Sequence, residues 1–153
     1  METGSRTCIR SVKGRFVMYM EILKDHHENI CKLIQIIDRA DTAEKVLRQA
    51  GDLAGAISRL AGLISVHLAA EDKFLYPNLA KSSDEKLRET ATAFEKEMGG
   101  LAKTFMAYKE DWMTPTKIKE APDACLAATQ ATIGALKKRL AREDKELYPL
   151  VEE

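Results

Sequence analysis

The sequence contains few of the residues that interrupt helices. Its 153 residues include 8 glycines, 4 prolines and 6% aromatic residues, whereas alanine, leucine, glutamate and lysine are common. This balance favours helices over sheets. The length suits one domain that can bury a core without disulfide or metal staples. We therefore expect a single all-α domain.

Cysteine is scarce, and its spacing suggests no pairing. Cys8, Cys31 and Cys125 are odd in number and form no CxxC pair, which argues against a disulfide framework or a thiolate zinc site. This usage fits a reducing cytoplasm. Cys31 follows His27 by four residues, and we expect a small buried thiol there, although the sequence does not fix its redox activity.

Neither sign of charge dominates, and no uninterrupted apolar run is long. Acidic and basic residues number 24 each and are interspersed, which argues against nucleic acid or anionic lipid as a partner. Residues 1–15 are predicted to form a basic, solvated arm, with Arg6, Arg10, Lys13 and Arg15. Without about 18 continuous apolar residues or a signal-peptide core, we expect a soluble cytoplasmic protein that is not exported and binds no membrane.

The motifs of common enzymes are also missing. The sequence has no recognisable nucleophile–base pair, phosphate-binding glycine loop or dinucleotide fingerprint. We expect no enzymatic activity.

Four segments instead show the apolar spacing of three and four residues that is typical of amphipathic helices. The helices are predicted from Phe16 to Ile37, from Asp41 or Thr42 to near Pro77, from the "SSDE" capping box at 82–85 to Tyr108, and from about Ala121 to Tyr148–Pro149. Their short connections favour an up-down-up-down four-helix bundle over residues 16–153. The two Tyr-Pro pairs are expected to end their helices.

Polar residues interrupt the apolar stripes at one level. His27 does so in the first helix, while His26 lies one position off the stripe and is expected to be exposed. The segment "HLAAEDKFLYP" at 67–77 carries His67 and Glu71 on one face and returns at 139–149 as "RLAREDKELYP". Because buried carboxylates are costly alone, we expect a cation beside them.

The repeated segments, together with "LKDHHENI" at 23–30 and "EMGGL" at 97–101, resemble the hemerythrin-like, or HHE cation-binding, family from about Phe16 onward. That family holds an oxo-bridged di-iron centre that binds oxygen between four helices. The resemblance implies His27, His67, Glu71 and Glu143 as metal ligands. It also implies histidines at two positions that are Met98 and Arg139 here. We therefore expect an incomplete di-iron site that does not carry oxygen reversibly.

Three hypotheses follow for this altered site. In the first, the Arg139 guanidinium bridges Glu71 and Glu143 in place of metal, in the salt-bridged core of a sensing or regulatory bundle. In the second, His27, His67, Glu71 and Glu143 hold a single iron, zinc or manganese ion. In the third, the bundle is a protein-interaction module similar in fold to some anti-sigma regulators of bacteria. The sequence identifies neither a partner nor an oligomeric state.

Overall fold

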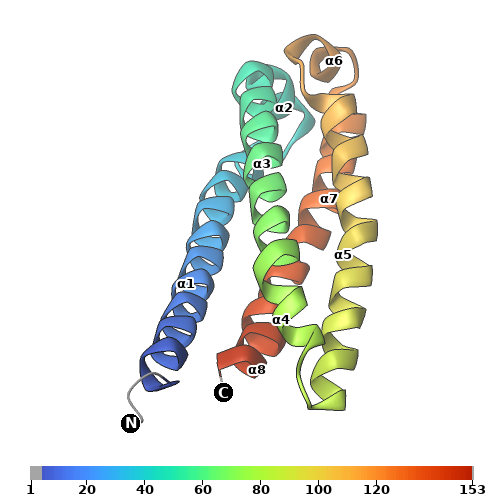
Figure 1. The fold of residues 1–153 in the computed structure, drawn as a ribbon. Helices are drawn as coiled ribbons and strands as arrows, with labels where there is room; N and C mark the ends of the chain where they lie inside the picture. The colour runs from blue at the N-terminus through green and yellow to red at the C-terminus, as the bar shows by residue number, and fades with distance from the viewer. Residues whose placement is uncertain (1–4, 153) are drawn as a thin grey trace.

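The computed structural model describes residues 5–152, with side chains described for residues 16–151. Its four long helices are α1 (Ser5–Asp38), α3 (Ala50–Ala70), α5 (Glu85–Trp112) and α7 (Pro122–Arg142). Figure 1 shows them packed lengthwise, with the chain reversing direction from each long helix to the next. The expected all-α bundle is confirmed for the described residues.

Two short helices, α2 (Ala43–Arg48) and α6 (Pro115–Glu120), lie together at one end of the bundle (Figure 1). The sequence analysis did not foresee them. Thr42 does cap a helix, since its hydroxyl accepts the Lys45 N–H at 3.1 Å, but that helix is α2 and not the long one that follows. The long helix α3 begins after Gln49.

The start of α5 also differs in detail from the predicted capping box. Asp84 is the N-cap, and its carboxylate accepts the N–H groups of Lys86 at 3.0 Å and Leu87 at 3.3 Å. Ser82 lies before the helix, where its hydroxyl accepts the Asp84 N–H at 3.1 Å. An aspartate is as good a cap as a serine, so the helix begins two residues later than the motif suggested.

The Tyr-Pro pairs do not end their helices, contrary to the prediction. The chain passes from α3 through a π-helical turn, η1 (Glu71–Leu75), into α4 (Tyr76–Ala80). It passes likewise from α7 through η2 (Glu143–Leu147) into α8 (Tyr148–Glu152). A proline normally clashes with the carbonyl four residues before it, and the wider π-turn gives that ring room.

Two apolar clusters form the core, and a polar layer separates them. One cluster runs through α1, α3, α5 and α7 and includes Ile30, Ile64 and Leu136. The other lies nearer the η turns and includes Leu23 and Leu147. Between them five buried polar side chains from α1, α3, η1, α7 and η2 come to one level: His27, His67, Glu71, Arg139 and Glu143.

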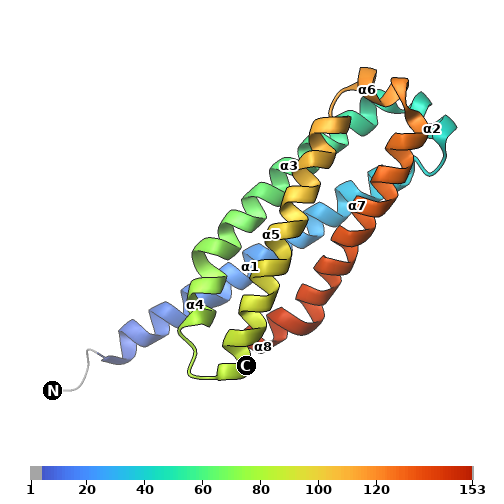
Figure 2. The ribbon, with the colours of Figure 1, turned by 90° about the vertical axis from the view of Figure 1, so that its right-hand side faces the viewer.

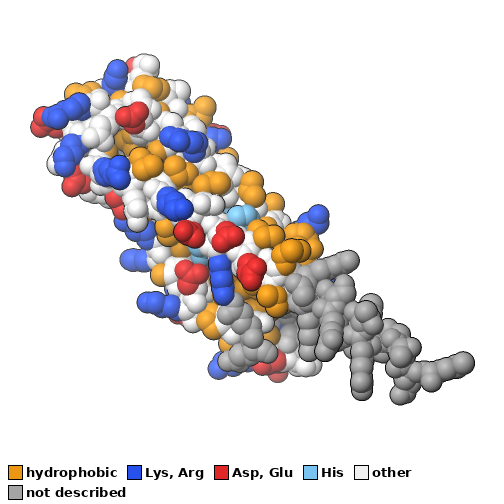
Figure 3. Space-filling model, turned by 90° about the vertical axis from the view of Figure 1, so that its left-hand side faces the viewer, with side chains coloured by type: hydrophobic (Ala, Val, Ile, Leu, Met, Phe, Trp, Pro, Cys, Tyr) orange, Lys and Arg blue, Asp and Glu red, His pale blue; other side chains and the backbone are white. Residues whose placement is uncertain are grey.

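The N-terminal part of α1 extends beyond the other helices (Figure 2). The basic arm predicted over residues 1–15 begins in residues that the structure does not describe. From Ser5 onward its backbone is helical and continuous with α1. Figure 3 shows basic, acidic and apolar side chains interspersed on one face of the bundle, in line with the mixed charge of the sequence.

One stretch, Ala50–Ala80, has the length and composition of a membrane span. The sequence analysis excluded a span by counting uninterrupted apolar residues, and the charged Arg59 divides this stretch. The evidence for a membrane is weak, because the core helix of a bundle has the same composition. Its buried face includes Leu53, Ile57 and Leu60, as expected for a core helix.

Adjacent isoleucines in α1 test the described packing directly. Ile37 is 1% exposed and Ile36 is 37% exposed. Ile37→Ala should lower the free energy of unfolding by about 2–5 kcal/mol through lost burial and a residual cavity. Ile36→Ala should change it by about 0.5 kcal/mol or less, since it touches the solvated face. Urea denaturation measures both, and equal losses would contradict the assigned face of α1.

Candidate metal centre

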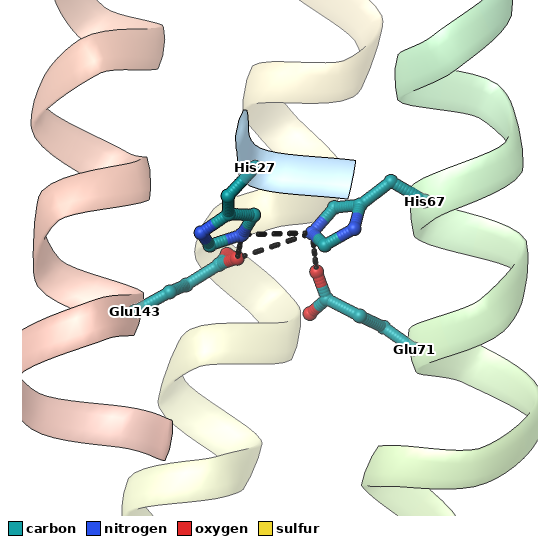
Figure 4. Close-up of side chains that lie close together, drawn as sticks. All are labelled: His27, His67, Glu71 and Glu143. Atoms are coloured by element: carbon teal, nitrogen blue, oxygen red, sulfur yellow. Dashed lines mark hydrogen bonds and ion pairs between the residues drawn. The ribbon is translucent and has the colours of Figure 1, made fainter. Parts of the chain in front are cut away.

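Four buried side chains converge where the two apolar clusters meet. His27 comes from α1, His67 from α3, Glu71 from the start of η1 and Glu143 from the start of η2 (Figure 4). One nitrogen or oxygen atom from each of the four lies within 4.8 Å of the others. The structure thus brings together all four residues that the resemblance implied as metal ligands.

The inward atoms are the Nε2 atoms of both histidines and one oxygen of each carboxylate. The two Nε2 atoms lie 3.1 Å apart. Glu143 Oε1 lies 3.0 Å from His27 Nε2 and 3.3 Å from His67 Nε2. Glu71 Oε1 lies 2.5 Å from His67 Nε2. Two ring nitrogens and two carboxylate oxygens therefore face one point.

Glu71 is the least satisfied of the four. Its side chain is 0% exposed, and neither carboxylate oxygen has a hydrogen bond of good geometry. Burial raises the pKa of this carboxyl, the nearby charge of Glu143 raises it further, and contact with His67 opposes both effects. A buried carboxylate with open oxygens is costly unless a cation binds it.

Glu143 has the opposite environment. Its Oε2 accepts the Nε–H of Arg139 at 2.7 Å, while its Oε1 faces the two histidines. Burial alone would raise the pKa of this carboxyl, but the histidines and Arg139 outweigh burial and hold the pKa far below its ordinary value. Of the two central carboxylates, only Glu143 has a fixed cation.

Arg139 does not bridge the two glutamates, so this part of the first hypothesis is wrong. Its guanidinium is buried at 2% exposure, donates from Nη2 to the Tyr76 hydroxyl at 3.0 Å and packs 4.6 Å from the centre of the Phe94 ring. The structure shows no ion pair between Arg139 and Glu71. The η1 glutamate is therefore left to His67, because the guanidinium is held on the Glu143 side by these partners.

Both histidines are also held at their outer nitrogens. His27 Nδ1 lies 2.9 Å from Asp144 Oδ1, and His67 Nδ1 lies 3.2 Å from His26 Nδ1. His27 is the core residue of the histidine pair, at 4% exposure. His26 is half-buried against His67, in contrast to the exposed position expected from the sequence. His26 lies one position beside the apolar stripe of α1, and its ring faces His67 on α3.

Two tyrosines belong to the centre, and the sequence analysis missed them. Tyr148 OH lies 3.0 Å from His27 Nε2 and 3.3 Å from Glu143 Oε1. In an α-helix, residues five apart lie about 140° around the axis from each other. In the π-turns the N–H of each tyrosine bonds the glutamate carbonyl five residues earlier, which returns its ring toward the same side. The repeated Glu-to-Tyr-Pro spacing was the available signal.

The tyrosines reach across the repeat. Tyr76, from the first copy, binds Arg139 of the second, and Tyr148, from the second copy, lies 3.5 Å from His67 of the first. The centre therefore has two halves of similar design. One half is built around His67, and the other around Arg139.

Met98 lies buried on α5 at 6% exposure and belongs to neither apolar cluster. It occupies the level at which the resemblance implied a histidine. Cys31 is exposed, which corrects the expectation of a buried thiol. Partial loss of solvent around the sulfur, and then the charge of Asp144, raise the pKa of this thiol, so it lacks the low pKa of a redox sensor.

The four residues could hold a metal ion. Nitrogen and oxygen ligands about 2.0–2.2 Å from a tetrahedral ion lie roughly 3.3–3.5 Å apart. Glu143 Oε1 is close to this spacing, at 3.0 and 3.3 Å from the two Nε2 atoms, whereas Glu71 Oε1 lies nearer to His67 Nε2, at 2.5 Å. Two imidazoles and two carboxylates suit zinc, iron or manganese. Among the described residues no second group of this kind is found. The Arg139 half offers a fixed cation and a thioether instead of ligands.

Comparison with known families gives one match. The family described as "Hemerythrin HHE cation binding domain" matches residues 18–151. No match was found among curated proteins or among solved structures. The matched range covers the polar layer and both repeated segments.

The pKa of His67 makes metal-free stability depend on pH. Burial lowers this pKa, but contacts with Glu143 and Glu71 outweigh burial and raise it from 6.5 to about 9. A pKa raised by folding stabilises the protein fully below the unfolded value near 6.5, and this stabilisation is lost as pH rises through about 9. Urea unfolding of chelator-treated protein should show that fall, and His67→Gln should flatten it. Constant stability over this interval would contradict the assignment.

Arg139→His tests the buried ion pair. Removing the guanidinium leaves Glu143 without its fixed cation, so the metal-free protein should lose about 3–5 kcal/mol of unfolding free energy. Arg142→His is the matched control on the same helix, because the Arg142 side chain is 42% exposed where it pairs with Glu97. This substitution should lower the free energy of unfolding by about 1 kcal/mol or less. Chelator-treated proteins are compared by urea denaturation. Equal effects of the two substitutions would refute a structural role for Arg139.

Proposed function

Because the chain belongs to the hemerythrin HHE cation-binding family, we propose that it binds a single metal ion, with Arg139 acting as the cation in the other half of the centre. The four ligands are His27, His67, Glu71 and Glu143. The observation that carries this proposal is the Glu71 carboxylate, which is wholly buried, has His67 as its one close partner and has no fixed cation beside it. A divalent ion supplies the positive charge that this carboxylate lacks.

The local charges support one divalent ion. Glu71 and Glu143 lie inside the centre, and Asp144 lies at its edge on His27. The fixed cation among them is the guanidinium of Arg139, which pairs with Glu143. Glu97 also lies 3.7 Å from Arg139 Nη1, but Arg142 pairs with this carboxylate outside the buried cluster. With both ligand imidazoles neutral, two negative charges remain, which is the charge that a divalent ion offsets. A nearby arginine would otherwise oppose metal binding, but its charge is already matched by Glu143.

Each residue then has a defined task. The imidazoles present Nε2 to the ion, Glu71 presents its free carboxylate, and Glu143 divides its oxygens between the ion and Arg139. When bound, the ion supplies positive charge and Lewis acidity between three helices. Since α1, α3 and α7 all contribute, loading the site stabilises the packed bundle over looser arrangements.

Reversible oxygen carriage is not part of this proposal. The ligands for a second ion are replaced by Met98 and Arg139, and the latter is fixed by Glu143 and Tyr76. We place the chain among sensing or regulatory bundles of the cytoplasm, where metal occupancy is the signal, and assign it no catalytic step. This role rests on the linkage between metal binding and helix packing.

Metal content decides the proposal. Protein purified without chelator and reloaded with iron, zinc or manganese should contain about one ion per chain, as a four-ligand site requires. Glu71→Gln removes the charged ligand and should lower affinity by at least about tenfold. Elemental analysis and chelator competition measure these values. Two ions per chain, or far less than one with every metal, would overturn the single-ion site.

A second comparison separates this site from adventitious binding. Glu89→Gln is the control, since Glu89 is an exposed carboxylate on α5 away from the buried cluster. It should leave both the metal content and the affinity unchanged. If Glu89→Gln and Glu71→Gln weakened binding equally, the ion would lie outside the buried centre.

A further inference from the structure

We propose that Asp144 and His26 are positioning residues that hold the two ligand imidazoles from outside the centre, an inference that rests on the proposed single-ion site. Each touches the Nδ1 atom of one ligand histidine, at 2.9 Å for Asp144 on His27 and 3.2 Å for His26 on His67. Neither residue offers an atom to the buried cluster itself. Their effect is to set which ring nitrogen carries the proton.

Asp144 fixes the tautomer of His27. Its carboxylate can only accept, so His27 Nδ1 must donate a proton to it. The lone pair of the neutral ring then lies on Nε2, which points at Glu143 and His67. A carboxylate on the outer nitrogen also makes the ring a stronger base toward a metal. Asp144 therefore both orients the ring and strengthens it as a ligand.

His26 performs the same task for His67 without a charge. One of the two facing Nδ1 atoms must donate and the other accept. When His67 uses Nε2 as a ligand, its Nδ1 carries the proton, and His26 Nδ1 accepts it. The rings meet edge to face, with their planes at 79°, which directs one nitrogen at the other. Asp144, at 52% side-chain exposure, and the half-buried His26 both reach the surface.

Figure 3 shows acidic side chains gathered around histidine surface on one face of the molecule. The outer layer of the centre is therefore open to solvent, while the four ligands are buried at 4% exposure or less. Substitutions of Asp144 and His26 change the hydrogen bonds of the ligand histidines without leaving a cavity in the core. This makes the two positioning residues separable from the ligands by experiment.

The internal repeat provides a matched control. Asp72 follows Glu71 as Asp144 follows Glu143, so the two aspartates occupy equivalent positions. No described hydrogen bond joins Asp72 to a histidine. It borders a surface cavity of about 260 Å³ with Leu68 and Tyr76 instead. The two residues are alike in chemistry and exposure, and they differ in the presence of a ligand imidazole.

The test is Co²⁺ and Zn²⁺ affinity, measured by chelator competition at fixed pH. Asp144→Ala should weaken binding by about 10–100-fold, as expected for loss of an outer partner, whereas Asp72→Ala should change it by about threefold or less. Asp144→Asn keeps an acceptor oxygen and should recover part of the loss. The visible absorption of bound Co²⁺ should change in Asp144→Ala and stay as in the parent protein in Asp72→Ala.

His26 is tested in the same way. His26→Leu removes the acceptor and should weaken binding by about 10–100-fold, and His26→Asn should restore part of it. Unfolding of the metal-free variants separates positioning from general destabilisation, because a purely structural role lowers stability without changing the Co²⁺ spectrum. If an alanine or leucine variant fails to fold, the asparagine variant decides through its spectrum.

The outcomes distinguish the two proposals. A parent protein that binds no metal refutes the proposed function and this inference with it. A parent protein that binds one ion, with Asp144→Ala and Asp72→Ala equal in affinity and spectrum, overturns the positioning role and leaves the single-ion site intact. Weakened metal binding in the Asp144 and His26 variants, with Asp72→Ala unchanged, supports the positioning role.

Discussion

The division of the Glu143 carboxylate between two kinds of partner organises the whole polar layer. One oxygen accepts from Arg139, and the other faces His27 and His67. This arrangement pairs the guanidinium with a carboxylate at the position where the resemblance implied a histidine. It leaves Glu71 as a buried carboxylate without a fixed cation. The asymmetry between two glutamates in equivalent positions is thus the physical basis of our proposal of one ion instead of two.

The backbone itself positions the side chains of this polar layer. Both copies of the repeat change from α-helix to a π-turn at the central glutamate, and both then continue through a Tyr-Pro pair. The wider turn directs each tyrosine hydroxyl into the centre, where Tyr76 holds Arg139 and Tyr148 faces His27. Apolar clusters on either side exclude water and raise the cost of any unmatched charge. Local backbone geometry and electrostatics therefore favour the same site.

Much of this could be predicted from the sequence, and the failures have physical causes. Periodicity predicted the four long helices, and the family resemblance implied His27, His67, Glu71 and Glu143 as ligands, which the structure brings together. A period of 3.6 residues cannot anticipate a π-turn, so the Tyr-Pro pairs were taken as helix ends and the place of the tyrosines in the centre was missed. The charge and shape of a guanidinium suggested that Arg139 bridges the two glutamates. Its actual orientation is set by the Tyr76 hydroxyl and the Phe94 ring. The contacts of His26 and Asp144 with the ligand histidines depend on how α1 packs against its neighbours. Residue spacing within one helix carries no information about that packing.

The most direct test of the central claim is anomalous X-ray diffraction from crystals of the metal-loaded protein, collected on both sides of the absorption edge of the metal. The account predicts one anomalous peak between His27, His67, Glu71 and Glu143, with the Arg139 guanidinium still on Glu143. Two peaks inside the bundle, with Arg139 turned out to solvent, would contradict it.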